Sequence, residues 1–159
     1  MLFSLLLAGG GYLYLGGGKT TKLALVSCEP ILLSGLEFRG VPGDEQLGRV
    51  FQEVEQFREE SPLHTIYFVE PAGKRDTLHV FVGIEAREEV PDEWIQKRVE
   101  CKEAVKASLD MHQWVMPSPE KTKRRIIDFA SANGHNLEGV FIDIIIDRDR
   151  VQVWAPLRN

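Results

Sequence analysis

The sequence contains few of the residues that a disulfide-rich scaffold, a zinc site or a nucleic-acid-binding surface requires. Cys28 and Cys101 are the two cysteines among 159 residues, too few for a framework of several disulfides or for a four-cysteine zinc site. There are 19 basic residues against 24 acidic ones, and the formal net charge is -5. Because nucleic acids are bound by basic surfaces that displace counterions, we expect no nucleic-acid partner.

Charge is also missing from the N-terminal segment, where residues 1–18 include no Asp, Glu, Lys, Arg or His and are rich in leucine and glycine. As a helix this segment would reach roughly 27 Å, slightly less than the ~30 Å hydrocarbon core of a bilayer. We predict a membrane anchor here, with a cleaved signal peptide or another kind of N-terminal extension as alternatives. Lys19 and Lys22 follow at once, so the positive-inside bias predicts that the domain at 19–159 faces the cytosol.

The remaining chain has the composition of one globular domain, with 43% hydrophobic and 27% charged residues overall. Its hydrophobic pattern predicts a strand, a helix and a hairpin, followed by the same elements about 74 residues later. The first copy comprises an extended segment at 21–38 that is broken at Pro30, a helix from Asp44 to about residue 60, and strands at 63–69 and 77–84. The second comprises an extended segment at 103–115, a helix from Ser118 to Gly134, and strands at 140–146 and 151–155.

Two β-α-β-β units of this kind predict an α+β fold, with one largely antiparallel sheet and both helices on one face. The cysteines also lie one repeat apart, so we expect them at symmetry-related core positions. We expect a groove along the pseudo-twofold axis, on the face that the helices leave uncovered. In the last hairpin, alternation places the β-branched side chains beneath the helices and turns three others toward this groove. Those three are Phe141, Asp143 and Ile145.

Three segments, taken in order, resemble GyrI-like (gyrase-inhibitor-like) effector-binding domains. They are Leu-Glu-Phe-Arg-Gly-Val-Pro-Gly at 36–43, Ile-Tyr-Phe-Val-Glu-Pro at 66–71, and the closing hairpin at 139–157 that ends in Pro-Leu. The similarity spans roughly residues 22–157 and implies a domain that binds a small molecule. An uncharged anchor followed by such a domain resembles the arrangement in one branch of the family, the testis-expressed receptor proteins of the endoplasmic reticulum. That likeness implies a single-pass protein of this membrane with a cytosolic domain.

The resemblance also implies which residues contact the ligand. The family carries an acid in its penultimate strand, a position that Asp143 occupies here, and nearby aromatic side chains complete the site. An organic cation or planar ligand would offset the desolvation of such an acid and stack on aromatic faces. The candidate ligand contacts are therefore Asp143, Tyr67, His79, Phe81, Trp114 and Trp154.

Other functions stay open at this point. Some members of the family resemble hydrolases of strained electrophilic molecules, and here Asp143 and Tyr67 could position the attacking water. We assign no residue a catalytic role. The domain could instead bind a protein partner, as a receptor or adaptor module in turnover of the endoplasmic reticulum. The histidines and cysteines show no metal-ligand spacing, so we predict neither a metal nor a cofactor. The sequence makes no prediction of oligomeric state.

Overall fold

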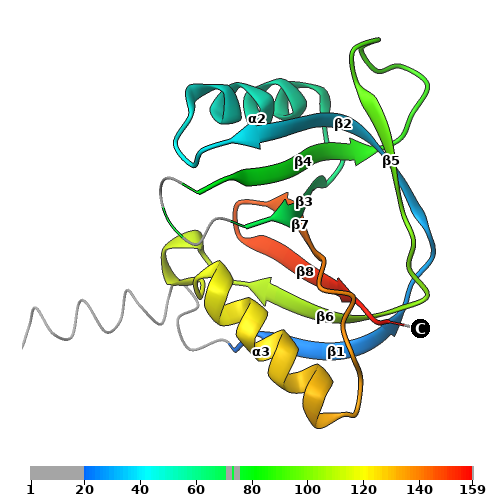
Figure 1. The fold of residues 1–159 in the computed structure, drawn as a ribbon, viewed down its shortest axis with the longest axis vertical. Coiled ribbons are helices and arrows are strands. Elements are labelled where there is room, and N and C mark those ends of the chain that lie inside the picture. Colours follow the sequence, from blue (N-terminus) through cyan, green and yellow to red (C-terminus); the bar gives the residue numbers. More distant parts are fainter. Residues whose placement is uncertain (1–19, 71–72, 74–75, 159) are drawn as a thin grey trace, which may run out of the picture.

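Eight antiparallel strands form one curved sheet, in the order β1-β6-β8-β7-β3-β4-β2-β5 (Figure 1). The structure is a computed structural model that describes residues 20–70, 73 and 76–158. The predicted membrane anchor at 1–18 therefore lies outside the described residues. Among the residues that are described, no helix is both long enough and apolar enough to cross a bilayer.

The strands confirm most of the predicted elements. Pro30 does separate two strands, and the hairpin strands lie within a residue or two of their predicted bounds. The strands are β1 (Lys22–Ser27), β2 (Ile31–Gly40), β3 (Leu63–Val69), β4 (Leu78–Glu85), β5 (Ile95–Val99), β6 (Glu103–Asp110), β7 (Phe141–Asp147) and β8 (Arg150–Pro156). β5 was not predicted, because its mostly exposed and charged side chains lack the hydrophobic alternation of a half-buried strand.

Two helices, α2 (Glu45–Phe57) and α3 (Pro119–Ala132), cover the same face of the sheet. Each begins at the predicted cap. The side chain of Asp44 accepts a hydrogen bond from the backbone N–H of Gln46, and that of Ser118 accepts one from Lys121. A short 3-10 helix, η1 (Gln113–Val115), fills the end of the segment that was predicted to be extended.

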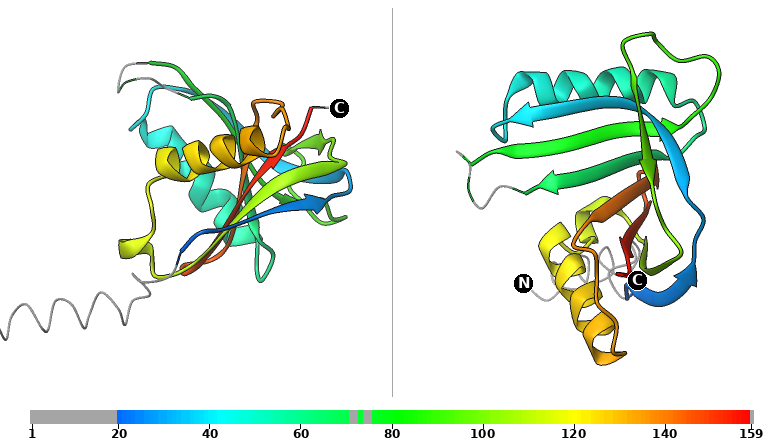
Figure 2. Two further views of the ribbon diagram at one scale, coloured as in Figure 1. Left: turned by 90° about the horizontal axis from the view of Figure 1, so that it is seen from below. Right: turned by 45° about the vertical axis from the view of Figure 1, so that its right-hand side comes forward.

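The two repeats are β2-α2-β3-β4 and β6-α3-β7-β8, and they meet where β3 pairs with β7 (Figure 2). Thr65 lies opposite Asp143 in this central pair. Each repeat also reaches across to the other, because β1 pairs with β6 and β5 pairs with β2. The predicted α+β fold with a duplicated unit is therefore present, and exchanged edge strands tie its halves together.

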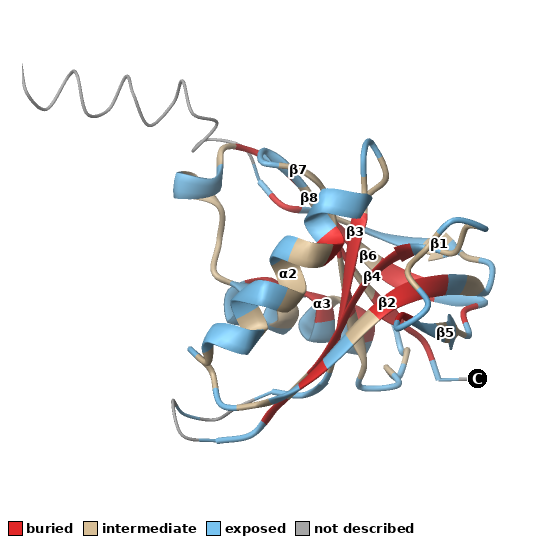
Figure 3. Ribbon diagram, turned by 90° about the horizontal axis from the view of Figure 1, so that it is seen from above, coloured by how far each residue is buried: buried red, intermediate tan, exposed pale blue. Residues whose placement is uncertain are grey.

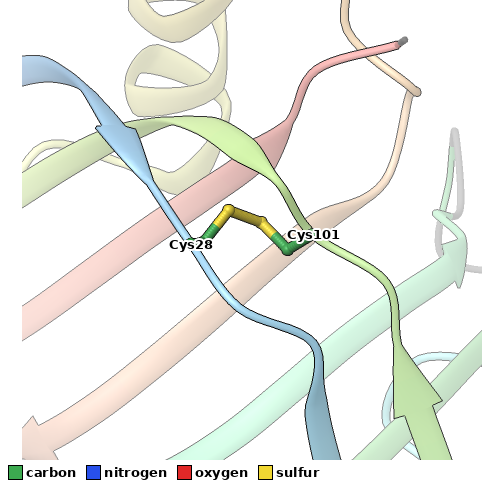
Figure 4. Close-up of a disulfide and its surroundings, with 2 residues drawn as sticks. All are labelled: Cys28 and Cys101. Carbon is green, nitrogen blue, oxygen red and sulfur yellow. A yellow bond between two sulfur atoms is a disulfide. The ribbon is translucent and has the colours of Figure 1, made fainter.

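A disulfide joins the two crossing segments, between Cys28 after β1 and Cys101 before β6 (Figure 4). Their Cα atoms lie 5.5 Å apart, within the usual range for a disulfide. The cysteines occupy corresponding places in the two repeats, as the spacing predicted, but only Cys101 is buried and Cys28 is half-buried. That they are bonded to each other was not predicted, since pairing depends on how the strands cross.

Both faces of the sheet are apolar. In the last hairpin, the side chains that were predicted to face the helices lie on the opposite face. On the helix side, α2 packs with Tyr67 and Ile145, and α3 packs with Phe141. The opposite face has its own core cluster, which contains no helix residue and is formed by Leu33, Ile66, Phe81, Ile142 and Ile144. Figure 3 shows buried segments along the strands and on the sheet-facing side of the helices.

The expectation that Phe141, Asp143 and Ile145 face away from the helices was therefore wrong. Alternation correctly grouped these side chains on one face, but a β-branched row cannot identify the helix-covered face when the other face is buried too. The groove accordingly lies on the helix side of the sheet.

Candidate functional site

A cavity of about 460 Å³ opens beside the start of α3, between that helix, the segment at 113–117 and the β7-β8 hairpin. Its wall is mostly apolar, and Asp143 and Thr122 are two of the polar groups on it. The lining residues of the wall that carry apolar side chains are Leu109, Met116, Pro117, Pro119, Ile145, Val151 and Val153. We call this space the Asp143 cavity.

Asp143 is placed on the cavity wall by the central strand β7, where its neighbours Ile142 and Ile144 point to the opposite face. The Oδ1 atom of its carboxyl group is buried and has no hydrogen-bond partner among the described residues. Burial raises the pKa of Asp143 to about 6, although the nearby positive charge of Lys123 opposes this rise. The carboxylate is therefore largely ionised at neutral pH while one oxygen stays available to a donor.

Two threonine hydroxyl groups are in a similar situation. Thr122 in α3 lines the Asp143 cavity, and Thr65 lies directly across from Asp143 in β3. Both side chains are buried, and their Oγ1 atoms also lack a hydrogen-bond partner within the described part of the chain. Unpaired buried polar groups are unusual in folded proteins because each costs desolvation energy. A ligand or water in the Asp143 cavity would complete the hydrogen bonding of Asp143 and Thr122, which both line it.

A second cavity of about 580 Å³ adjoins the first, on the side of α3 that faces the end of β3. Tyr67, Glu70, Phe141 and Lys123 are among its lining residues, and Lys123 lines the Asp143 cavity as well. Lys123 forms an ion pair with Glu70, and its Nζ lies 4.8 Å from the centroid of the Tyr67 ring and 5.2 Å from that of Phe141. Burial, with the negative charges of Asp143 and Glu70, raises the pKa of Tyr67 to about 12.

Of the six predicted contact residues, the structure brings Asp143 and Tyr67 to these adjoining cavities and places the other four elsewhere. Phe81 and Trp154 pack in the core cluster of the opposite face. His79 contacts the Phe68 ring and lies 3.3 Å from a carboxylate oxygen of Glu37. Trp114 in η1 is 79% exposed. Alternation along β4 and β8 places His79, Phe81 and Trp154 on the face without helices, where the groove was predicted, whereas the cavities lie on the helix side.

Sequence reasoning missed Thr122 and Lys123. A signal for Thr122 was present, since Thr122, Ile126 and Ala130 recur every four residues and form the buried stripe of α3. Lys123 has no such signal, because it belongs to a run of basic residues that resembles an ordinary solvated helix face. In the described ranges, no group of three potential ligand side chains is arranged to hold a metal ion.

Comparison with known proteins relates this architecture to solved structures alone, since no family model and no curated protein matches the sequence. A hydrolase from Listeria innocua superposes with a TM-score of 0.62 at 11% identity, covering 86% of this chain and 92% of the hydrolase. The EcmrR C-terminal domain superposes with a TM-score of 0.61 at 10% identity, covering 89% of this chain and 99% of that domain. SAV2435, solved with tetraphenylphosphonium bound, superposes with a TM-score of 0.60 at 7% identity, covering 87% of this chain and 94% of SAV2435.

The chain has the same fold as the EcmrR C-terminal domain and SAV2435, a GyrI-like fold. The resemblance read from three sequence segments is thus confirmed at the level of the fold. The Asp143 cavity is lined by residues of the second repeat, next to the central β3-β7 pair.

Proposed function

We propose that this GyrI-like domain binds a small, planar molecule in the Asp143 cavity, with a ligand N–H or O–H group donating to Asp143. The observation that carries the proposal is the buried, unpartnered Oδ1 of Asp143 on an otherwise mostly apolar wall. A volume of about 460 Å³ lies within the range of small-molecule sites. Apolar walls supply the binding free energy, and the buried acceptor on Asp143 supplies specificity.

The fold supports the same proposal. SAV2435 shares this fold and has been solved with tetraphenylphosphonium bound, and the EcmrR C-terminal domain shares it too. For the present chain, the apolar cavity walls favour an apolar ligand, and the carboxylate oxygen favours one that carries a hydrogen-bond donor.

A binding experiment with N-phenyl-1-naphthylamine tests this function, because the dye is aromatic, uncharged and carries one N–H donor. We expect saturable binding to the full chain, and about tenfold weaker binding to Asp143→Leu, which loses a charge-assisted hydrogen bond while keeping the branched shape of the side chain. Dye fluorescence measured during titration gives both dissociation constants.

Glu85→Gln is the matched control, because Glu85 is an exposed acid at the end of β4. This variant should bind the dye as the wild type does. Any uptake of dye elsewhere on the protein is common to all three proteins and cancels in the comparison. Equal affinities for the wild type and Asp143→Leu would refute the proposed role of Asp143.

Hydrolysis is a second candidate function, favoured by the raised pKa of Asp143. A carboxylate with a pKa of about 6 is ionised at neutral pH yet is a stronger base than an ordinary aspartate. It could accept a proton from water as the water oxygen bonds to an epoxide carbon and the ring C–O bond breaks; the proton then returns to the ring oxygen. Conversion of styrene oxide to its diol should then occur and be lost in Asp143→Asn. The absence of diol with the wild-type chain would remove this candidate.

Residues 1–18 form part of the proposal as a membrane anchor for the domain. The disulfide between Cys28 and Cys101 bears on the side that the domain faces. Structural disulfides persist in oxidising compartments and are rare in the cytosol, so this bond favours the non-cytosolic side, opposite to the side predicted from Lys19 and Lys22. Alkylation of the protein in intact cells, followed by non-reducing electrophoresis, tests which side is correct.

A further inference from the structure

Lys123 lies at the centre of a cluster that has the composition of a cation-binding site. The rings of Tyr67 and Phe141 lie within about 5 Å of its ammonium group, at 4.8 and 5.2 Å. Glu70 forms an ion pair with it, and Asp143 is close enough for the charge of Lys123 to lower its pKa. Aromatic faces combined with carboxylates are the arrangement by which proteins bind quaternary and other organic cations.

The burial of Lys123 is unusual for a surface lysine. Its side chain is 12% exposed, whereas its partner Glu70 is 44% exposed. Because Glu70 is itself partly exposed, the ion pair with it accounts for only part of what holds this flexible side chain in place. The two rings account for it better, because a cation that is partly removed from water gains more from aromatic faces. Lys123 thus behaves as a ligand that the chain itself supplies.

We propose that Lys123 sets the charge preference of the groove, by occupying the position that an organic cation would otherwise take. The proposal rests on the small-molecule-binding function argued above and specifies its ligand class. Uncharged donors bind in the Asp143 cavity beside Lys123, and organic cations are excluded by repulsion and by the occupied rings. The internal ammonium competes well because, being tethered, it loses no translational freedom on binding.

Shortening Lys123 should therefore create a cation site. Lys123 lines both cavities, so an alanine at this position joins them and leaves the rings of Tyr67 and Phe141 facing the two carboxylates. Alanine also has the highest helix propensity, which keeps α3 intact. Lys123→Met provides a second variant that removes the charge while keeping most of the volume.

The test compares two probes of the same shape, phenyltrimethylammonium and the uncharged tert-butylbenzene, in ligand-observed NMR titrations of the full chain. We expect the wild type to bind tert-butylbenzene more tightly than the cation. In Lys123→Ala the affinity for the cation should rise by about tenfold or more, so that the preference reverses. Lys123→Met should show a smaller change in the same direction, because the charge is gone but the space remains filled.

Lys121→Ala is the matched control, since Lys121 lies on the exposed side of the same helix and lines neither cavity. Its preference should equal that of the wild type. An unchanged preference in Lys123→Ala, with circular dichroism showing a folded protein, would overturn the inference; N-phenyl-1-naphthylamine binding would then show whether the proposed function survives. Failure of every variant to bind any probe would overturn both.

Discussion

Replacing Asp143 by asparagine should stabilise the protein at pH 8, by about 2 to 3 kcal/mol in the free energy of unfolding. The reason is the difference between the pKa of the carboxyl group in the folded chain, about 6, and its ordinary value of 3.8. Above pH 6 the folded protein must hold an ionised carboxylate in a largely buried position, whereas the unfolded chain exposes it to water. Asparagine has nearly the same shape and carries no charge.

The stabilisation should depend on pH in a defined direction. Because the folded state binds the proton more tightly, the wild type gains stability relative to Asp143→Asn as the pH falls from about 6 to about 4. Below the ordinary pKa of 3.8 the group is neutral in both states, and the difference between the two proteins disappears. Burial also lowers the pKa of His64, so the folded protein loses stability as this histidine becomes protonated over part of the same pH range. This loss is equal in the wild type and in Asp143→Asn, and it cancels in the comparison.

Urea unfolding at pH 8, 6 and 4 measures this effect, with Asp92→Asn as the control. Asp92 is an exposed acid in the loop before β5, and its replacement should change stability little at any of the three values. A loss of stability in Asp143→Asn at pH 8 would contradict the account of Asp143 as an uncompensated buried charge.

The same acid should thus cost stability and contribute binding. A residue retained only for packing or for an internal hydrogen bond would destabilise the fold when it is replaced. An acid that stabilises the protein when neutralised, yet weakens dye binding when removed, shows the trade-off expected of a functional group. The two measurements together separate a binding role from a structural one.

Removing the disulfide should have the larger effect on stability. Cys28→Ser is expected to lower the free energy of unfolding by about 4 kcal/mol, the loop-closure value for residues separated by 73 positions. The bond joins the segments through which β1 and β5 cross to the opposite repeat, so it restrains the unfolded chain over nearly half its length. Thermal and urea unfolding of the oxidised wild type and the variant provide the comparison.

The double variant Cys28→Ser/Cys101→Ser should match the single variant, and the wild type in a thiol reductant should fall to the same level. Agreement among these three would assign the effect to the bond rather than to a cavity left by sulfur. Equal stability of the oxidised wild type and the double variant would show that the bond does not restrain the chain.

Local sequence was sufficient to predict most of the secondary structure, and the family resemblance pointed to Asp143. The caps at Asp44 and Ser118, the break at Pro30 and the alternation of the hairpins act over a few residues, so they can be read from neighbouring side chains. The order of these elements also indicated the duplication. It placed Asp143 and Tyr67 on strands that meet at the centre, where the structure finds them on adjoining cavities.

Tertiary structure decided which face carries the groove, that β5 joins the sheet, that Cys28 and Cys101 are bonded, and that Lys123 enters the site. Each of these depends on contacts between residues far apart in the chain. Alternation states which side chains share a face, but both faces of this curved sheet are apolar, so only packing against α2 and α3 distinguishes them. Lys123 looks like any surface lysine until the fold places the rings of Tyr67 and Phe141 beside it.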